Sequence, residues 1–352
     1  MHPEHSHTYT IEPGDTVRDH DTILALWQGN FGPDEEHTAK LRHYYEQCPF
    51  GTPLLCLLRH QPSGQPVGVI GAIPRRMIMG GREIRGAVIS HFVVLPAHRS
   101  LGPALQLQAA IIEACHGRFD FIYGIPNQKA TAILKRAGHR ELCQLERHVK
   151  VLRYGQYLPR IMPALPARLL APVVDAAVRV RHALRAAFRF GLHARWSEQA
   201  DPRMDEAWAA TAPADDLLAV RDSTHARWRF NTVPSERMRF LLVSRGDSLR
   251  AWFVCEDSTG APGTLAVLDY WFAGADLRER RSAIRVLLDR AVADGHTAVE
   301  LLITGNRVAA DGWAAERFIH RGGQSIMGKW LDESQRAPDP ARIHMTYSDQ
   351  DS

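Results

Sequence analysis

A basic turn between an apolar stretch and a helical pattern is the part of this sequence best suited to hold phosphate. The apolar stretch ends at residues 93–95, and Arg99-Ser100-Leu101-Gly102-Pro103-Ala104 leads into the helical pattern of residues 105–115. Freed backbone N–H groups at the start of a helix, with the positive end of its dipole behind them, form an anion site. Arg99 adds a positive charge, so the segment is predicted to wrap a pyrophosphate.

The spacing Arg99-x-x-Gly102-x-Ala104 has neither the lysine of a Walker loop nor the three glycines of a dinucleotide fingerprint. It resembles the coenzyme A loop of the GNAT acyltransferase superfamily. The following strand pattern, the Pro126-Asn127 corner and a helix closing at Gly138 extend the resemblance over about residues 68–150. The alternative interpretation is a strand-to-helix turn in which Gly102 only permits the bend.

The resemblance implies acetyl-CoA, or a longer acyl-CoA, as co-substrate, and no metal. The residues expected to bind it are Val93, Val94, Leu95, Arg99, Ser100, Leu101, Gly102, Pro103, Ala104 and Asn127. Pro103 removes one backbone donor from the loop, although proline is tolerated in the first turn of a helix.

The expected proton-transfer groups depart from the family pattern. Leu134 occupies the position of the tyrosine that family members commonly use as general acid, and an alkyl group cannot donate a proton. We expect His91 to act as base, because an imidazole titrates near neutral pH. Tyr123 is a second candidate acid, and backbone N–H groups near Val94 and Leu95 are expected to stabilise the oxyanion. The alternative for His91 is a packed core histidine.

Length and order of elements predict an α/β fold of two GNAT-like domains, each a mixed central sheet flanked by helices. The expected boundaries are an acyl-CoA-binding domain at 1–152, a Pro/Arg-rich helical connector at 153–200, a degenerate GNAT-like domain at 201–332 and a polar tail at 333–352. The second domain repeats the element order of the first. Asp276 stands where the second phosphate loop would be, and a carboxylate there competes for the anion site.

Composition narrows the class of protein. The net charge of the 352 residues is only +4, and arginine richness alone does not indicate nucleic-acid binding. Five scattered cysteines without a C-x-x-C pair indicate reduced thiols. No signal-peptide pattern and no apolar run of spanning length are found, so a cytoplasmic location is expected. His2, His5 and His7 are interpreted as a polar terminus and not as a metal site.

The connector carries arginines at helical spacing in residues 174–190, namely Arg179, Arg181, Arg185 and Arg189. Such a basic amphipathic helix suits an anionic membrane surface. The alternative is a helix packed between the domains with solvated arginines.

The acceptor is predicted to be the amine of a small molecule such as an amino sugar or an amino acid. Asp222, Trp228, Arg229 and Asp269 are expected to line its cleft, in a segment that resembles tandem acyltransferase-like proteins. The alternative for these four residues is a structural ion pair with a core tryptophan. The predicted function is N-acyl transfer, most simply N-acetylation. Two alternatives are a non-catalytic acyl-CoA-binding scaffold and an aminoacyl-tRNA-dependent ligase. The sequence predicts no oligomeric state.

Overall fold

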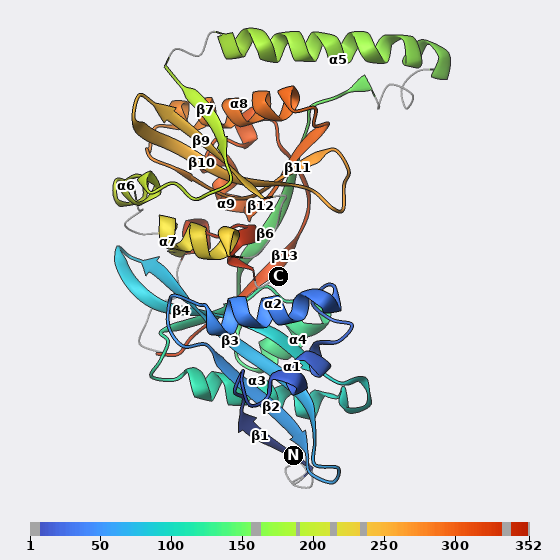
Figure 1. Ribbon diagram of the computed structural model, residues 1–352, viewed down its shortest axis with the longest axis vertical. Coiled ribbons are helices and arrows are strands. Elements are labelled where there is room, and N and C mark those ends of the chain that lie inside the picture. Colours follow the sequence, from blue (N-terminus) through green and yellow to red (C-terminus); the bar gives the residue numbers. More distant parts are fainter. Residues whose placement is uncertain are drawn as a thin grey trace.

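The chain folds around one long twisted sheet, seen in the computed structural model of Figure 1. The structure describes residues 8–155, 163–187, 191–211, 217–232, 238–332 and 339–350. The N-terminal half comprises β1 (Tyr9–Pro13), α1 (His20–Trp27), α2 (His37–Leu41), β2 (Leu54–His60), β3 (Gln65–Met79), β4 (Arg82–Val94), α3 (Leu101–Cys115), β5 (Phe121–Gly124), α4 (Gln128–Arg136) and β6 (Arg140–Val151).

A long helix, α5 (Ala164–Ala187), precedes the C-terminal half. That half comprises β7 (His193–Ser197), α6 (Arg203–Ala209), β8 (Leu217–Ala219), α7 (Ser223–Ala226), β9 (Arg239–Arg245), β10 (Ser248–Asp257), β11 (Thr264–Phe272), α8 (Leu277–Ala293), β12 (Ala298–Thr304), α9 (Gly305–Ala310), β13 (Ile319–Trp330) and β14 (Ile343–His344). The predicted antiparallel strands followed by β-α-β-α therefore recur in both halves, as expected.

The two halves exchange their last long strands. The sheet order is β1-β2-β3-β4-β5-β13-β6-β12-β11-β10-β9-β7. β13, from the C-terminal half, lies between β5 and β6, and residues 145–151 of β6, from the N-terminal half, pair with the whole length of β12. Each half therefore completes its sheet with a strand from the other.

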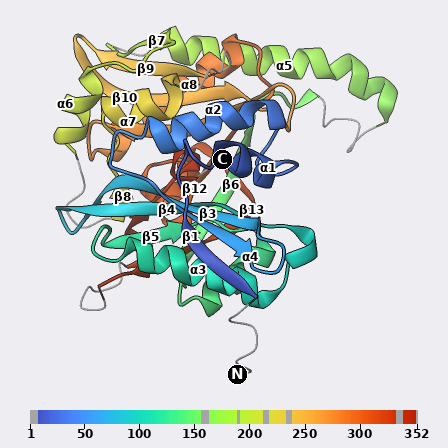
Figure 2. The same ribbon diagram turned by 60° about the horizontal axis from the view of Figure 1, so that its bottom comes forward.

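Alternating side chains bury both faces of the sheet. On β3, Val69 and Ile73 pack into the cluster that includes Ile23 and Leu26 of α1, while Ile70 packs into the cluster under α3. All nine residues of β11 are buried, as a strand covered on both faces requires. Figure 2 shows the N-terminal half with α1 and α2 on one side of its strands and α3 on the other.

The C-terminal end of the chain differs from the predicted polar tail. Within 333–352, Ile343 and His344 form β14 beside β8, and Thr346, Ser348 and Asp349 are at most 1% exposed. Their burial depends on contacts with Arg221 and Asp269, which lie far away in the sequence. The residue pattern of 333–352 alone cannot reveal such contacts.

The connector helix differs from expectation: it begins ten residues earlier, at Ala164, and continues through Pro172. Before β13 the chain holds only a helical turn at Ala314–Glu316, because Arg317 adopts a left-handed conformation at φ 62°. The predictions for His2, His5, His7, residues 188–190 and the side chain of Arg185 fall on parts that the structure does not describe. Over the described helices, none is both long and apolar enough to cross a bilayer.

Candidate active site

The main cavity opens where two parallel strands part. β4 and β5 pair only from Gly86–Phe121 to Val88–Tyr123, and beyond that point they diverge. A cavity of about 680 Å³ fills the gap. Its walls come from both halves of the chain: Phe31, Gly32, Lys40, Ile89, Ser90, His91, Phe92, Gln108, Gly124, Ile125, Pro126, Asn127, Ala130, Leu134, Thr259, Gln324, Tyr347 and Gln350.

The predicted phosphate loop lies between the end of β4 and the start of α3. Arg99 Nε donates to the Val94 carbonyl at 3.1 Å, and the Leu95 amide donates to Val67 at 2.8 Å, so both ends of the loop are anchored to the sheet. Because the Leu95 amide is already bonded, it does not fit the oxyanion-donor role expected for it. A Cβ atom on Gly102 would meet nothing within 4 Å, which leaves open space over the helix start.

The starts of α3 and α8 differ in how they are capped. Ser100, the N-cap of α3, makes no side-chain capping bond, so the first amides of that helix have no side-chain acceptor. Asp276, the N-cap of α8, accepts a hydrogen bond from the Arg278 amide at 2.8 Å. The equivalent helix of the second half therefore carries its own carboxylate at the position where α3 can take an external anion.

His91 lines the cavity at a bulge in β4. The residue has a φ of 51°, and its ring stacks on Trp27 with 4.3 Å between centroids. Its Nδ1 lies 2.9 Å from the Tyr45 hydroxyl and also contacts Ser90 Oγ. Burial, assisted by Lys40 and His37, lowers the pKa of His91 to about 3. The imidazole is therefore neutral at pH 7 and a much weaker base than the sequence-based expectation assumed.

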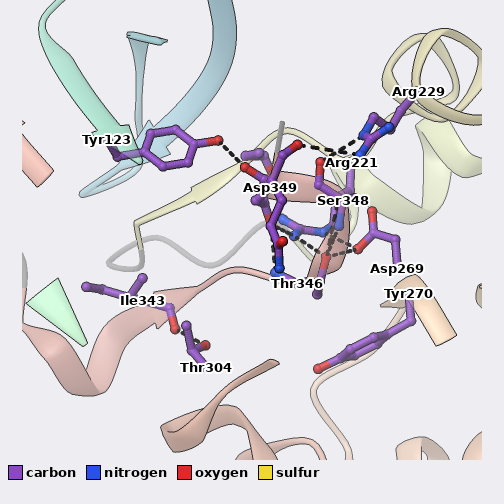
Figure 3. Close-up of polar contacts among 12 residues, drawn as sticks. Tyr123, Arg221, Arg229, Asp269, Tyr270, Thr304, Ile343, Thr346, Ser348 and Asp349 are labelled. Carbon is purple, nitrogen blue, oxygen red and sulfur yellow. Dashed lines mark hydrogen bonds and ion pairs between the residues drawn. The ribbon is translucent and has the colours of Figure 1, made fainter. Parts of the chain in front are cut away.

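Tyr123 occupies the core and is absent from the cavity walls. Its side chain is fully buried, and the hydroxyl donates to the Asp349 carbonyl at 3.1 Å (Figure 3). This contact fastens the C-terminal segment to β5 and does not match the acid role expected for Tyr123. Asn127 does line the cavity, and its side chain also caps α4 by accepting from the Ala130 amide at 3.0 Å.

The four expected acceptor residues lie in the packed contact between the halves. Asp269 accepts from buried Arg221 at 2.9 Å and from Thr346, and Arg221 also pairs with Asp349 (Figure 3). Asp222 caps α7 and pairs with Arg76 at 2.7 Å.

Trp228 and Arg229 complete that contact. Trp228 stacks on His43 with 4.9 Å between centroids, and Arg229 donates to the Ser348 carbonyl and the Tyr44 hydroxyl. None of the four lines the 680 Å³ cavity. This geometry matches the alternative of structural ion pairs and a core tryptophan.

Three cavity residues escaped the sequence analysis. Gln108, on the third turn of α3, is 0% exposed, and neither polar atom of its amide has a hydrogen-bond partner among the described residues. Tyr347 and Gln350 arrive from the C-terminal segment, more than two hundred residues from the loop. For Gln108 the sequence did hold a signal, because it is the one polar residue on the otherwise apolar inner face of residues 104–115.

Solved structures provide the comparison with known proteins. A GCN5-related N-acetyltransferase from Anabaena variabilis aligns with a TM-score of 0.63 at 12% identity, covering 92% of this chain and 73% of that chain. A second GCN5-related N-acetyltransferase, from Kribbella flavida, aligns with a TM-score of 0.63 at 14% identity, covering 93% of this chain and 72% of that chain. The chain has the GNAT fold. Saccharomyces cerevisiae N-myristoyltransferase with bound myristoyl-CoA aligns with a TM-score of 0.53 at 11% identity, covering 96% of this chain and 88% of that chain. No family model and no curated protein sequence matches.

The fold prediction is thereby confirmed, and the parting of β4 from β5 is the feature that gives this GNAT fold its cavity. The GNAT element order is present twice. In the first copy α3 is uncapped and contributes Gln108 to the cavity wall, whereas Asp276 caps the equivalent helix α8 of the second copy. Among the described residues, no three histidine, cysteine, aspartate or glutamate side chains group together as a metal site.

Proposed function

We propose that this protein is an acyl-CoA-dependent N-acyltransferase that acylates the amine of a small molecule, with acetyl-CoA as the simplest donor. The observation that carries the proposal is the cavity at the parting of β4 and β5, whose walls include Gln108 of α3, the helix with the uncapped start. None of residues 93–104 lines this cavity. A helix that has an uncapped N-terminus and also contributes to the wall of such a cavity suits a ligand with a phosphate end and a reactive end.

The donor is proposed to bind in two parts. The pyrophosphate would rest on the free amides of Leu101 and Gly102, with Arg99 beside them, because Pro103 has no amide hydrogen to donate. The pantetheine arm would run along β4 beyond Val88, where β5 no longer pairs with it. The unpartnered amide of Gln108 faces this cavity and is proposed to hydrogen-bond the polar groups of that arm.

The transfer itself requires few groups. The neutral amine attacks the thioester carbonyl carbon, the C–S bond breaks, and the departing thiolate takes up a proton. Tyr347 is the one tyrosine among the described residues that line the cavity, so we assign it the donor role that Leu134 cannot fill. His91 is neutral and its ring is held by the Tyr45 hydroxyl. Its imidazole is proposed to accept a hydrogen bond either from the amine itself or from a water molecule that takes the proton of the amine.

Ligand-dependent thermal stabilisation tests the donor site. A ligand at a hundredfold over its dissociation constant adds about 2.7 kcal/mol to the free energy of unfolding. We expect this shift with acetyl-CoA in the wild type and in the control Gly102→Ala, because a Cβ there meets no neighbour. Gly102→Glu should abolish it by placing a carboxylate in the anion site. The absence of a shift with acetyl-CoA and with every longer acyl-CoA would refute the acyl-CoA proposal.

Turnover tests the enzyme assignment separately. Release of free thiol from acetyl-CoA is measured against a panel of amino sugars and amino acids, and we expect Tyr347→Phe to lower kcat about 10²–10⁴-fold while the acetyl-CoA thermal shift stays unchanged. Binding of acetyl-CoA without turnover on any amine would favour the acyl-CoA-binding scaffold.

A further inference from the structure

Helix α5 exposes an unusual number of large apolar side chains. Over the described residues, ten such side chains are exposed, and half of them belong to this one helix. They are Leu169 (71% exposed), Leu170 (44%), Val173 (62%), Val180 (58%) and Leu184 (56%). Scattered exposed apolar residues are ordinary, but a contiguous group on one element marks an interaction surface.

The five side chains share one face of the helix. At about 100° per residue, they fall within an arc of about 100°. Ala176 and Ala177 lie next to the same arc and are also exposed.

That apolar face points away from the body of the protein. The attachments to the body are made by His182, which is buried and bonded to Asp289 of α8, and by Asp175, whose Oδ1 accepts from the Gly155 amide at 3.0 Å. Both residues lie about 180° around the helix from the apolar face. An ordinary surface helix buries its apolar stripe, whereas α5 keeps Val174 and Val178 half-buried and leaves a second apolar stripe exposed.

Arginines outnumber acidic residues on α5 and lie to either side of the apolar face. Arg181 lies about 20° beyond one edge of the apolar arc, Arg179 and Arg168 lie about 80° and 100° beyond the other edge, and all three residues are exposed. Asp175, the single acidic residue of α5, accepts from the Gly155 amide. An apolar stripe on a helix whose exposed charged side chains are basic fits the headgroup boundary of an anionic bilayer, with the long arginine side chains reaching the lipid phosphates.

We propose that α5 is a membrane-surface helix that seats the protein on anionic lipid. The helix lies along one end of the molecule, over α8, while α3 and the cavity-bearing half lie toward the other end (Figures 1 and 2). A bilayer bound to α5 therefore leaves the acyl-CoA cavity open to solvent.

Vesicle flotation of the full chain tests the proposal. The protein is expected to float with vesicles of phosphatidylcholine mixed with phosphatidylglycerol and to remain unbound with phosphatidylcholine alone. Val173→Ser/Val180→Ser should weaken flotation at least about tenfold, because it removes apolar contact with the acyl region. Arg179→Glu/Arg181→Glu should do the same, and higher salt should weaken the wild type. The control Val17→Ser/Ile319→Ser removes equally exposed apolar groups elsewhere and should float as the wild type does.

Two results would overturn the proposal. The first is a wild type that does not float with anionic vesicles, or an α5 variant that floats equally well. The second is a concentration-dependent dimer in analytical ultracentrifugation that disappears in Val173→Ser/Val180→Ser without any flotation of the wild type. That outcome would assign the apolar face to a second copy of the chain. Neither readout depends on acyl transfer, so the test is independent of the proposed function.

Discussion

At the scale of single residues, Gln108 links stability to ligand binding. Its amide is buried on α3 without a partner in the described protein, which costs about 1–3 kcal/mol of stability. We expect Gln108→Leu to raise the free energy of unfolding by about that amount and to reduce the thermal shift caused by acetyl-CoA. Urea unfolding with and without ligand measures both effects.

The matched control for this prediction is Gln106→Leu, the same substitution on the same helix at a half-buried position outside the cavity walls. It should change neither quantity by more than about 0.5 kcal/mol. A Gln108→Leu protein that binds acetyl-CoA as the wild type does would exclude Gln108 from the donor site.

His139 makes stability depend on pH. Burial, with a contribution from Lys329, lowers the pKa of His139 to about 4, whereas an unfolded histidine titrates near 6.5. The unfolded chain therefore binds the extra proton first, and the stability present above pH 6.5 is lost as the pH falls toward 4. His139→Phe should remove this loss, and its stability gain over the wild type should be about 2 kcal/mol larger at pH 5 than at pH 7.5.

Chemical unfolding at the two pH values measures this difference. His116→Phe, at an exposed position, is the control and should show no such pH-dependent gain. An equal gain for His139→Phe at both pH values would mean that His139 carries its charge in the folded protein.

Sequence spacing predicted the parts of the candidate site that are close together in the chain. Arg99, Gly102 and Asn127 lie within thirty residues, and their order along strand, turn and helix predicts the loop, but of the three only Asn127 lines the cavity. Tyr347 could not be found in this way, because its segment is held by contacts with residues far away in the sequence, among them the buried Arg221–Asp349 ion pair and the Tyr123–Asp349 hydrogen bond. Asp222 and Asp269 have the side chains of a polar site, but each is held in an ion pair, Asp222 with the partly exposed Arg76 and Asp269 with the fully buried Arg221.

At the scale of elements, Gly328 permits the strand exchange. It lies on β13 between β5 and β6, where a Cβ atom would stand 2.6 Å from Leu142 Cδ1 and 2.9 Å from the Phe121 ring. Gly328→Val should therefore lower the free energy of unfolding by about 1–3 kcal/mol through overpacking. The shift of the urea midpoint measures this loss.

The control for Gly328→Val is Ile319→Val on the same strand, where the side chain is 53% exposed and the loss should be negligible. A Gly328→Val protein with unchanged stability would mean that β13 moves apart from β5 without loss.

Element order was predictable, and strand neighbours were not. The C-terminal half repeats the element order of the N-terminal half, as the sequence predicted. The sequence of β13 does not show whether this strand pairs with its own half or with the other half, because both pairings place the same side chains on the same faces of the sheet. The exchange also replaces two separate sheets by one continuous sheet.

At the scale of the whole molecule, the exchange joins the two halves into one cooperative unit. If the N-terminal half unfolds, β12 loses its neighbour β6; if the C-terminal half unfolds, β5 loses its neighbour β13. Either event leaves an unpaired strand edge in the half that is still folded. We therefore expect a single calorimetric transition whose van't Hoff and calorimetric enthalpies agree. Two resolved transitions, one of them alone sensitive to acetyl-CoA, would mean that the halves unfold independently.

The exchanged strand also sets an order of events during synthesis. β5 leaves the ribosome about 200 residues before β13, its neighbour in the finished sheet. At about 5–20 residues per second, the edge of β5 waits roughly 10–40 s for its partner. Throughout that interval the nascent N-terminal half presents an unpaired, apolar edge, a ready template for mispairing with another chain. Translation speed and chaperone access across residues 125–318 thus become determinants of how much active protein a cell obtains.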